Sequence, residues 1–248
     1  MPTRSLKWYN NRNRSIQDRI NTGTGGKSME DRTDKIIVTI DREFGSGGRE
    51  VGKRLAERLG IKFYDEELIS RAAASTGYHE EYIKENDEKA PDYSVSSFFT
   101  GVDMFQSSPY TKIQEEEFRI IREIASEESC VIMGRAADYI LSDERHVSIF
   151  IFAPIEDRIR RNLALAPIRF PDENLDEAGM EKKVKQTDKQ RRRYYEFYTD
   201  NKWGGRDVYD LLINTSRAGV EGAVDIIEAY IKGGKDKNLL SDIENLTE

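Results

Sequence analysis

Cysteine and histidine are scarce in this 248-residue chain, which contains one cysteine, Cys130, and two histidines. A single cysteine excludes an internal disulfide, and so few of these residues form no recognisable metal-ligand cluster. We therefore expect no metal site built from protein ligands alone. Because disulfides accumulate in oxidising compartments, we also expect a protein of the reducing cytoplasm.

Long apolar runs are missing as well. No run approaches the length of a membrane span, and the N-terminal residues lack the apolar core of a signal peptide. The formal net charge of −7 argues against general nucleic-acid binding, because proteins that bind the phosphate backbone usually carry a basic surplus. The sequence thus predicts no membrane and no nucleic-acid partner, and its length suits one domain with a small insertion.

Both ends of the chain lack a sustained apolar period. Residues 1–33 are polar, which predicts a flexible N-terminal extension, and residues 233–248 predict a flexible C-terminal tail. The stretch NTGTGGKS, residues 21–28, misses the pattern G-x-x-x-x-G-K-[ST] only at Asn21. A working loop of that kind needs a strand before it and a helix after it, and neither neighbour has the apolar pattern. We interpret the stretch as a chance match.

Between these ends, residues 34–232 alternate short apolar runs with helical periods. The runs IIVTI, IKFY, CVIMG, HVSIFIF and VYDLLIN predict five strands. This alternation predicts an α/β fold, a three-layer sandwich with a five-stranded parallel sheet. Ligands of such sheets bind beyond the carboxyl ends of the strands. We therefore expect the loops after Ile40, Tyr64, Gly134 and Phe152 to surround one cleft.

The helical periods predict the segments between the strands. Apolar residues recur at helical spacing over 51–59, and Asp65 is placed to cap the start of the next helix. Further helices are predicted at about 111–128, from 154 onward, at 176–200 and at 219–231.

A glycine-rich stretch, DREFGSGGRE at residues 41–50, separates the first strand from the first helix. Gly45, Gly47 and Gly48 permit positive φ angles and a close approach of backbone to a ligand. A turn of this kind that opens a helix directs several N–H groups at an anion. The alternative is that the glycines mark only a tight strand–helix turn.

Arginines converge on the same edge of the expected sheet. Arg135 follows the third strand, where a guanidinium suits a bidentate anion contact better than a core. Residues 182–193 hold seven Lys/Arg against one Asp in an otherwise acidic chain. Alone, this segment could equally be a solvated helix face. Beside a phosphate-binding turn it favours phosphoryl transfer, which needs mainly positioning and neutralisation of negative charge.

Four segments resemble, in order, the cytidylate kinase-like branch of the P-loop nucleoside monophosphate kinases. They are TIDREFGSGGREVGKRLAERLGIKFYDEELI, GRAADYIL, HVSIFIFAPIEDRIRR and DKQRRRYYEFYTDNKWGGRDVYDLLINTS. The resemblance covers residues 35–231 and implies a P-loop NTPase type of fold with a helical acceptor-binding insertion at about 65–128 and a lid at about 158–195. It also implies ATP as phosphoryl donor, Mg²⁺, and small-molecule nucleotides as partners, and it leaves a homodimer open.

The resemblance further implies roles for individual residues. The donor ATP would be held by Gly45, Ser46, Gly47, Gly48, Arg49, Glu50 and Thr215. The acceptor would be bound by Asp65, Arg71, Arg135, Asp188 and Arg191. The transfer itself would be assisted by Arg49, Arg158, Arg161 and Arg191.

The chain also departs from cytidylate kinases. Gly48 takes the place of the loop lysine and Glu50 that of a hydroxyl residue, so Arg49 or a lid arginine is expected to supply the missing charge. Glu66 replaces a serine, and Ala136 replaces an aspartate of the set that reads cytosine. Three hypotheses remain open: a kinase for CMP or dCMP, a kinase for another small acceptor, and a nucleotide-binding regulator with little turnover.

Overall fold

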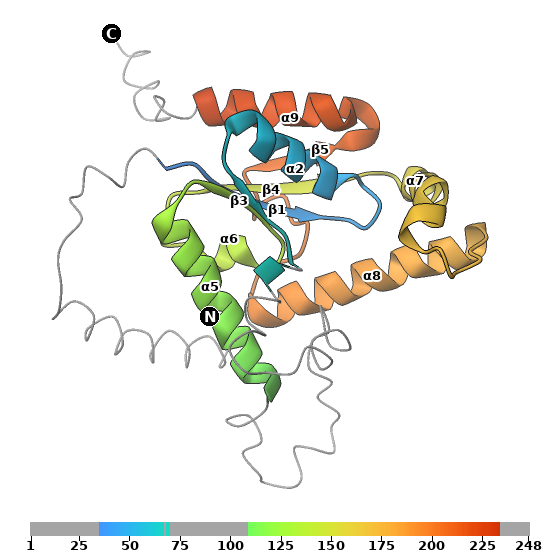
Figure 1. The fold of residues 1–248 in the computed structure, drawn as a ribbon, viewed down its shortest axis with the longest axis horizontal. Helices are drawn as coiled ribbons and strands as arrows, with labels where there is room; N and C mark the ends of the chain where they lie inside the picture. The colour runs from blue at the N-terminus through green and yellow to red at the C-terminus, as the bar shows by residue number, and fades with distance from the viewer. Residues whose placement is uncertain (1–34, 67, 70–108, 234–248) are drawn as a thin grey trace, which may run out of the picture.

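The computed structural model describes residues 35–66, 68–69 and 109–233 (Figure 1). The predicted N-terminal extension, most of the predicted acceptor-binding insertion and Arg71 lie outside these ranges. The predicted C-terminal tail also lies outside them, except for Gly233, the last residue of a helix.

The centre of the fold is a sheet of five parallel strands in the order β2-β3-β1-β4-β5. The strands are β1 (Ile37–Arg42), β2 (Lys62–Tyr64), β3 (Cys130–Met133), β4 (Val147–Phe152) and β5 (Leu211–Asn214). Every residue of β1 is buried, because this strand lies in the middle of the sheet and is covered on both faces. The predicted α/β fold with a five-stranded parallel sheet is confirmed.

Helices cover both faces of the sheet (Figure 1). The helices α2 (Gly48–Leu59) and α9 (Thr215–Gly233) lie on one face, and α5 (Pro109–Glu127) and α6 (Ala137–Ile140) lie on the other. The helices α7 (Ile155–Arg169) and α8 (Glu177–Tyr198) extend past the carboxyl ends of the strands. None of the helices in the described ranges is long and apolar enough to span a membrane.

The two faces of the sheet have different cores. The core under α2 and α9 is aliphatic and contains Val38, Ile40, Val51, Leu55, Ile149, Val224 and Ile227. The core under α5, α6 and the end of α8 is rich in aromatic rings, among them Phe118, Phe150, Tyr194, Tyr195, Trp203 and Tyr209. We call these the aliphatic face and the aromatic face. A third, smaller core joins α7 to α8 through Ile159, Ala166, Met180 and Val184.

The first strand is longer than the sequence predicted. It runs to Arg42 instead of ending at Ile40, because Asp41 and Arg42 continue the ladder with β4 opposite Phe150 and Ile151. Charged residues normally end a buried strand, but these two find buried polar partners, as described below. The glycine loop therefore begins two residues later than expected.

Candidate functional site

The glycine loop lies between β1 and α2 and has the geometry of an anion-binding turn. Gly45 and Gly47 have φ angles of 84° and 85°, in the left-handed region that favours glycine. Gly47 is the N-cap of α2, and no side chain caps this end of the helix. Because the first N–H groups of a helix have no partner within it, the loop offers them and the helix dipole to a negative group.

Two hydroxyl groups hold the loop, one from within it and one from the chain after β5. Ser46 Oγ donates to the carbonyl of Glu43 at 2.8 Å. Thr215 Oγ1, at the end of β5, lies 2.6 Å from the carbonyl oxygen of Ser46 and 3.3 Å from that of Phe152. Thr215, predicted beside the donor nucleotide, thus ties the loop to the ends of β4 and β5.

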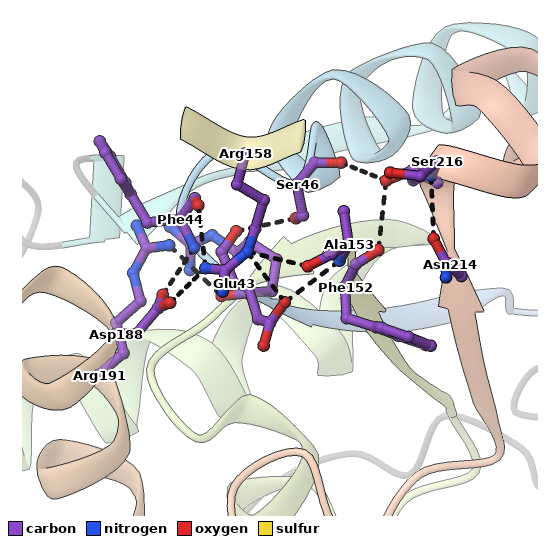
Figure 2. A network of polar contacts seen from close by, with 12 residues as sticks. Glu43, Phe44, Ser46, Phe152, Ala153, Arg158, Asp188, Arg191, Asn214 and Ser216 are labelled. Carbon is purple, nitrogen blue, oxygen red and sulfur yellow. Dashed lines mark hydrogen bonds and ion pairs between the residues drawn. The ribbon is translucent and has the colours of Figure 1, made fainter. Parts of the chain in front are cut away.

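Arg158 and Asp188 connect the loop to α7 and α8 (Figure 2). Asp188 accepts a hydrogen bond from the backbone N–H of Phe44 at 2.7 Å and forms an ion pair with Arg158. The buried Arg158 also donates from Nε to the carbonyl of Ala153 at 2.9 Å and lies 3.3 Å from a carboxylate oxygen of Glu43. Burial raises the pKa of Glu43 although Arg158 opposes the shift. Both predicted site residues therefore hold the loop in place.

Arg161 lies directly against the loop. A Cβ atom built on Gly47 would be 3.4 Å from the guanidinium carbon of Arg161. The guanidinium forms an ion pair with Glu50, in the first turn of α2, and Glu50 also bonds Arg54 at 2.8 Å. Of the residues expected to replace the missing lysine charge, Arg161 is the one whose guanidinium lies against Gly47.

Asn162 is a neighbour of the loop that the sequence analysis missed. It is fully buried, and a Cβ atom on Gly45 would lie 2.2 Å from its side-chain nitrogen. This nitrogen has no hydrogen-bond partner among the described residues. An asparagine in the middle of a helix belongs to no motif, so only its position in the fold draws attention to it.

Arg49 contacts Asp65, the residue directly after β2. Its Nε donates to a carboxylate oxygen of Asp65 at 3.1 Å, and its side chain is 61% exposed. The other oxygen of Asp65 accepts from the N–H of Leu68 at 3.0 Å, which is the helix cap that the sequence predicted. These two predicted site residues form a pair beside the second strand.

A polar pocket opens at the carboxyl ends of β1 and β3. We call it the arginine pocket; it is lined by Asp41, Arg42, Gly134, Arg135, Ala136, Arg191, Tyr194, Tyr195 and Trp203. Arg135 and Ala136 have φ angles of 59° and 52°, an uncommon conformation for residues with a Cβ atom. The buried Arg135 lies 3.7 Å from Glu117, with its guanidinium 5.5 Å from the centre of the Tyr194 ring.

Glu66 gathers two arginines at the edge of this pocket. It forms an ion pair with Arg42, and its carboxylate lies 3.7 Å from Arg191. Burial alone would raise the pKa of Glu66, but the charges of Arg42 and Arg191 outweigh it and lower the pKa to about 2. Arg191 also donates to the backbone carbonyl of Arg42 at 3.3 Å. The sequence analysis gave Arg42 no role; its signal is a charged residue directly after a buried run.

Two buried carboxyl groups belong to this region: Asp41 lines the pocket, and Asp138 lies near Asp41. Tyr209 donates to Asp41 at 2.9 Å, and Tyr195 donates to Asp138 at 2.5 Å. Burial raises the pKa of Asp41 to about 7, with a further contribution from Asp138, whose own pKa burial raises to about 6. The sequence analysis missed these groups because their partners lie 168 and 57 residues away along the chain.

The predicted site residues that the structure describes thus form four groups. Gly45, Ser46, Gly47, Gly48, Glu50, Arg161 and Thr215 lie at the glycine loop; Arg135 and Arg191 line the arginine pocket; Arg158 and Asp188 fasten the loop to α7 and α8. Arg49 and Asp65 lie beside β2, and Arg71 lies outside the described residues.

Comparison with known proteins gives one consistent family. A family model described as the cytidylate kinase-like family matches residues 37–217. The cytidylate kinase of Pyrococcus horikoshii is 29% identical over 80% of this chain and 89% of its own length. The cytidylate kinase of Methanocaldococcus jannaschii is 26% identical over 79% of this chain and 97% of its own length.

Solved structures give the same fold. An uncharacterised protein from Eubacterium ventriosum is 31% identical, with a TM-score of 0.60 over 80% of this chain and 99% of its own. A shikimate kinase from Bacteroides thetaiotaomicron, 14% identical, has a TM-score of 0.50 over 79% of this chain and 98% of its own. At that identity the second structure is similar in fold alone.

Proposed function

Since the chain belongs to the cytidylate kinase-like family, we propose that it transfers the γ-phosphoryl group of ATP to a nucleoside monophosphate, with CMP or dCMP as acceptor. One observation carries the proposal: a phosphate-binding turn and a pocket of buried arginines occupy the same edge of the sheet. Arg191 links the two, because it lines the pocket and bonds the last residue before the loop.

The chemistry asks for charge and position. The bond between the γ-phosphorus and the oxygen bridging it to ADP breaks, and its electron pair stays on ADP. An oxygen of the acceptor phosphate forms the new bond to phosphorus. The loop amides would hold the donor phosphates, Arg161 would neutralise charge beside Gly47, and Arg135 with Arg191 would grip the acceptor phosphate.

Mg²⁺ fits this site when it is held mainly by phosphate. Among the described residues no cluster of three or more acidic, cysteine or histidine side chains could bind a metal by itself. In phosphoryl-transfer sites, however, Mg²⁺ takes one or two carboxylates together with phosphate oxygens and waters. Glu50, in the first turn of α2 and 39% exposed, is the carboxylate that would bind it. The ion would neutralise the donor phosphates.

We propose that α7 and α8 are the two arms of a lid. They pack on each other through their own small core, and residues 170–176 connect them. Arg158 and Asp188 attach them to the loop by polar contacts, and Phe44 of the loop packs against their core. A lid of this kind would exclude water while it brings Arg161 to the phosphates.

Two positions favour a second candidate, a kinase of the same fold that acts on another small phosphorylated or hydroxylated molecule. Ala136 lines the pocket with no polar side-chain atom. Glu66 is bound to Arg42, so its carboxylate is engaged where a serine would offer a hydroxyl. Both residues depart from cytidylate kinases, and Ala136 replaces an aspartate of the set that reads cytosine.

An ADP-release assay with ATP and Mg²⁺ tests the proposal. CMP, dCMP, UMP, AMP, GMP and no acceptor are compared, with the Arg135→Lys variant as the control for the pocket. We expect turnover to be highest with CMP or dCMP and to fall in the variant. Turnover only with a different phosphorylated or hydroxylated molecule supports the second candidate. ATP binding without turnover on any acceptor contradicts both and identifies a regulator.

A further inference from the structure

The cation and the glycine of the loop pattern have exchanged places in this chain. In G-x-x-x-x-G-K-[ST], a glycine stands six residues before the lysine. Gly48 occupies the lysine position here, and the residue six positions before it is Arg42. The loop therefore has an arginine where the pattern has its first glycine, and a glycine where the pattern has its cation.

Positions 42 and 48 lie so close together that their side chains would clash. A Cβ atom built on Gly48 would lie 2.5 Å from Cβ and 3.0 Å from Cγ of Arg42, and 3.3 Å from Cβ of Ile151. The shortest of these distances is well below any normal carbon–carbon contact. A side chain at 48 and one at 42 thus exclude each other, so a lysine at 48 requires glycine at 42.

Arg42, the last residue of β1, extends into the arginine pocket. It is 5% exposed, and its stem packs beside the first residue of α2. Its guanidinium nitrogen Nη1 lies 2.7 Å from the place of a Cβ atom on Gly134, at the end of β3. Glu66 forms an ion pair with the guanidinium, and Arg42 lines the pocket together with Arg135. A buried cation thus lies between the phosphate-binding turn and the pocket.

We propose that Arg42 is the cation that neutralises the transferring phosphoryl group, in place of the missing loop lysine. This inference rests on the proposed kinase function. Arg42 transfers no proton and forms no covalent bond; it donates hydrogen bonds to phosphate oxygens while the γ-phosphoryl group passes from ADP to the acceptor oxygen. A planar guanidinium can reach oxygens of two phosphates at once, which a point-charge ammonium does less well. Glu66 is its positioning residue.

Four proteins test the exchange: the wild type, Arg42→Gly, Gly48→Lys and the double variant Arg42→Gly/Gly48→Lys. We expect Arg42→Gly to lower turnover by about 10²-fold or more, as loss of a donor to transition-state charge does. Gly48→Lys should lower the melting temperature, because the new side chain meets Arg42. The double variant, which restores the G-x-x-x-x-G-K spacing, should recover most of the turnover. A double variant no better than either single variant overturns the exchange.

A conservative variant separates charge from packing. Arg42→Gln keeps most of the stem, and Arg191, 3.7 Å from Glu66, still faces that carboxylate, so the variant should fold although it is less stable. Arg206→Gln, at a side chain 87% exposed, is the control. The readout is the ratio of ATP to ADP affinity, measured by calorimetry, which a purely structural role would not change. We expect the ratio to fall in Arg42→Gln and to stay constant in Arg206→Gln.

The outcomes distinguish the inference from the proposed function. If the wild type phosphorylates no acceptor while the affinity ratio falls in Arg42→Gln, the proposed function fails, and Arg42 is left as a residue that binds the γ-phosphate without transfer. If the wild type is active and a folded Arg42→Gln keeps both its turnover and its affinity ratio, the role of Arg42 is overturned and the kinase function stands. A wild type that does not bind ATP contradicts both.

Discussion

The two faces of the sheet differ in what they bury. The aliphatic face buries Val, Ile, Leu and Ala side chains against α2 and α9. The aromatic face buries rings together with ionisable groups, among them Asp41, Asp138 and Arg135. Burying a charge costs free energy unless it is paired, and here burial raises the pKa of both carboxyl groups. The aliphatic face therefore stabilises the fold, whereas the aromatic face is less stabilising because it buries the ionisable groups of the pocket.

Ion pairs divide in the same way. On the outside, Arg58 of α2 pairs with Glu221 and Asp225 of α9, and exposed pairs of this kind contribute little to stability. Beside the pocket, the pair between Arg42 and Glu66 is largely buried. Loss of one partner of a buried pair leaves an uncompensated charge, which is strongly destabilising. An arginine–carboxylate ion pair can therefore be lost at little cost in stability between α2 and α9, but not beside the pocket.

The largest effect is expected at the carboxyl edge, where both faces end. Arg161→Ala should lower turnover by about 10³-fold while ATP affinity changes little, because its contact with the phosphoryl group would form mainly in the transition state. Steady-state kinetics measure both quantities. The neighbour Arg160, with a side chain 79% exposed, is the matched control, and Arg160→Ala should be silent. Wild-type turnover in both Arg161→Ala and Arg191→Ala would remove the lid arginines from the mechanism.

Next in size is a cavity on the aliphatic face. Ile227 is fully buried, so Ile227→Ala should lower the free energy of unfolding by about 2–5 kcal/mol. Turnover per folded molecule should stay at the wild-type level, because the aromatic residues that line the arginine pocket belong to the other face. Urea unfolding measures the first quantity. Ile226→Ala, at a side chain 44% exposed on the same helix, controls for helix propensity. A loss of turnover in the folded Ile227→Ala protein would contradict the claim that the aliphatic face contributes to stability alone.

A smaller effect is expected when the positive charge at position 135 is kept but the planar guanidinium is replaced. Arg135→Lys should weaken the acceptor about tenfold, roughly 1.4 kcal/mol, because lysine cannot form the planar fork. The KM for the acceptor measures this, and the KM for ATP should not change. Arg193→Lys, at an exposed position of α8, should leave both values unaltered. Equal increases of both KM values would mean that Arg135 does not belong to the acceptor side.

The last expected effect is a dependence of stability on pH that comes from the aromatic face. The pKa of Asp41 is raised from its ordinary value of 3.8 to about 7 by burial and by Asp138, against Tyr209, Arg42 and Arg191. The folded protein therefore holds a proton that the unfolded chain releases near pH 4. Its contribution to the free energy of unfolding is complete below pH 4 and declines as the pH rises through about 7.

Asp41→Asn tests this dependence. The variant should reduce the decline in stability between pH 4 and 7 by about 1–3 kcal/mol, because asparagine does not ionise and can still accept from Tyr209. Thermal melts across this range measure it. Asp172→Asn, at an exposed position between α7 and α8, should leave the pH profile unchanged. A wild-type profile in Asp41→Asn would show that the buried carboxyl does not titrate in this window.

The elements of the fold could be predicted because they depend on local patterns. Apolar runs predicted the five strands. Asp65 was predicted to cap the start of a helix, and its hydrogen bond from the N–H of Leu68 confirms the cap. The end of β1 was predicted two residues early, since no local rule tells that Asp41 and Arg42 find buried partners. The kinked start of α9 was missed for a similar reason: Gly219, where the prediction began, lies inside the helix with a φ angle of 69°.

The candidate site was only partly predictable. Its glycines and Arg135 follow directly from the strand–loop rule, which needs nothing but the order of elements. Arg42 could not be identified that way, because its importance depends on the Cβ atom that Gly48 lacks. The pairs of Asp41 with Tyr209 and of Asp138 with Tyr195 join distant segments, which a single sequence does not reveal.

The lone cysteine makes the chain a ready scaffold for site-directed labelling. Cys130 lies in β3 with no exposed surface, and burial raises the pKa of its thiol to about 12. At neutral pH it is therefore both inaccessible and protonated, and it will react slowly with maleimides or iodoacetamides. A cysteine introduced at Ile168, 80% exposed near the end of α7, can carry a fluorophore or spin label without background from the native thiol. Movement of the arms on nucleotide binding then becomes measurable without first removing a cysteine from the core.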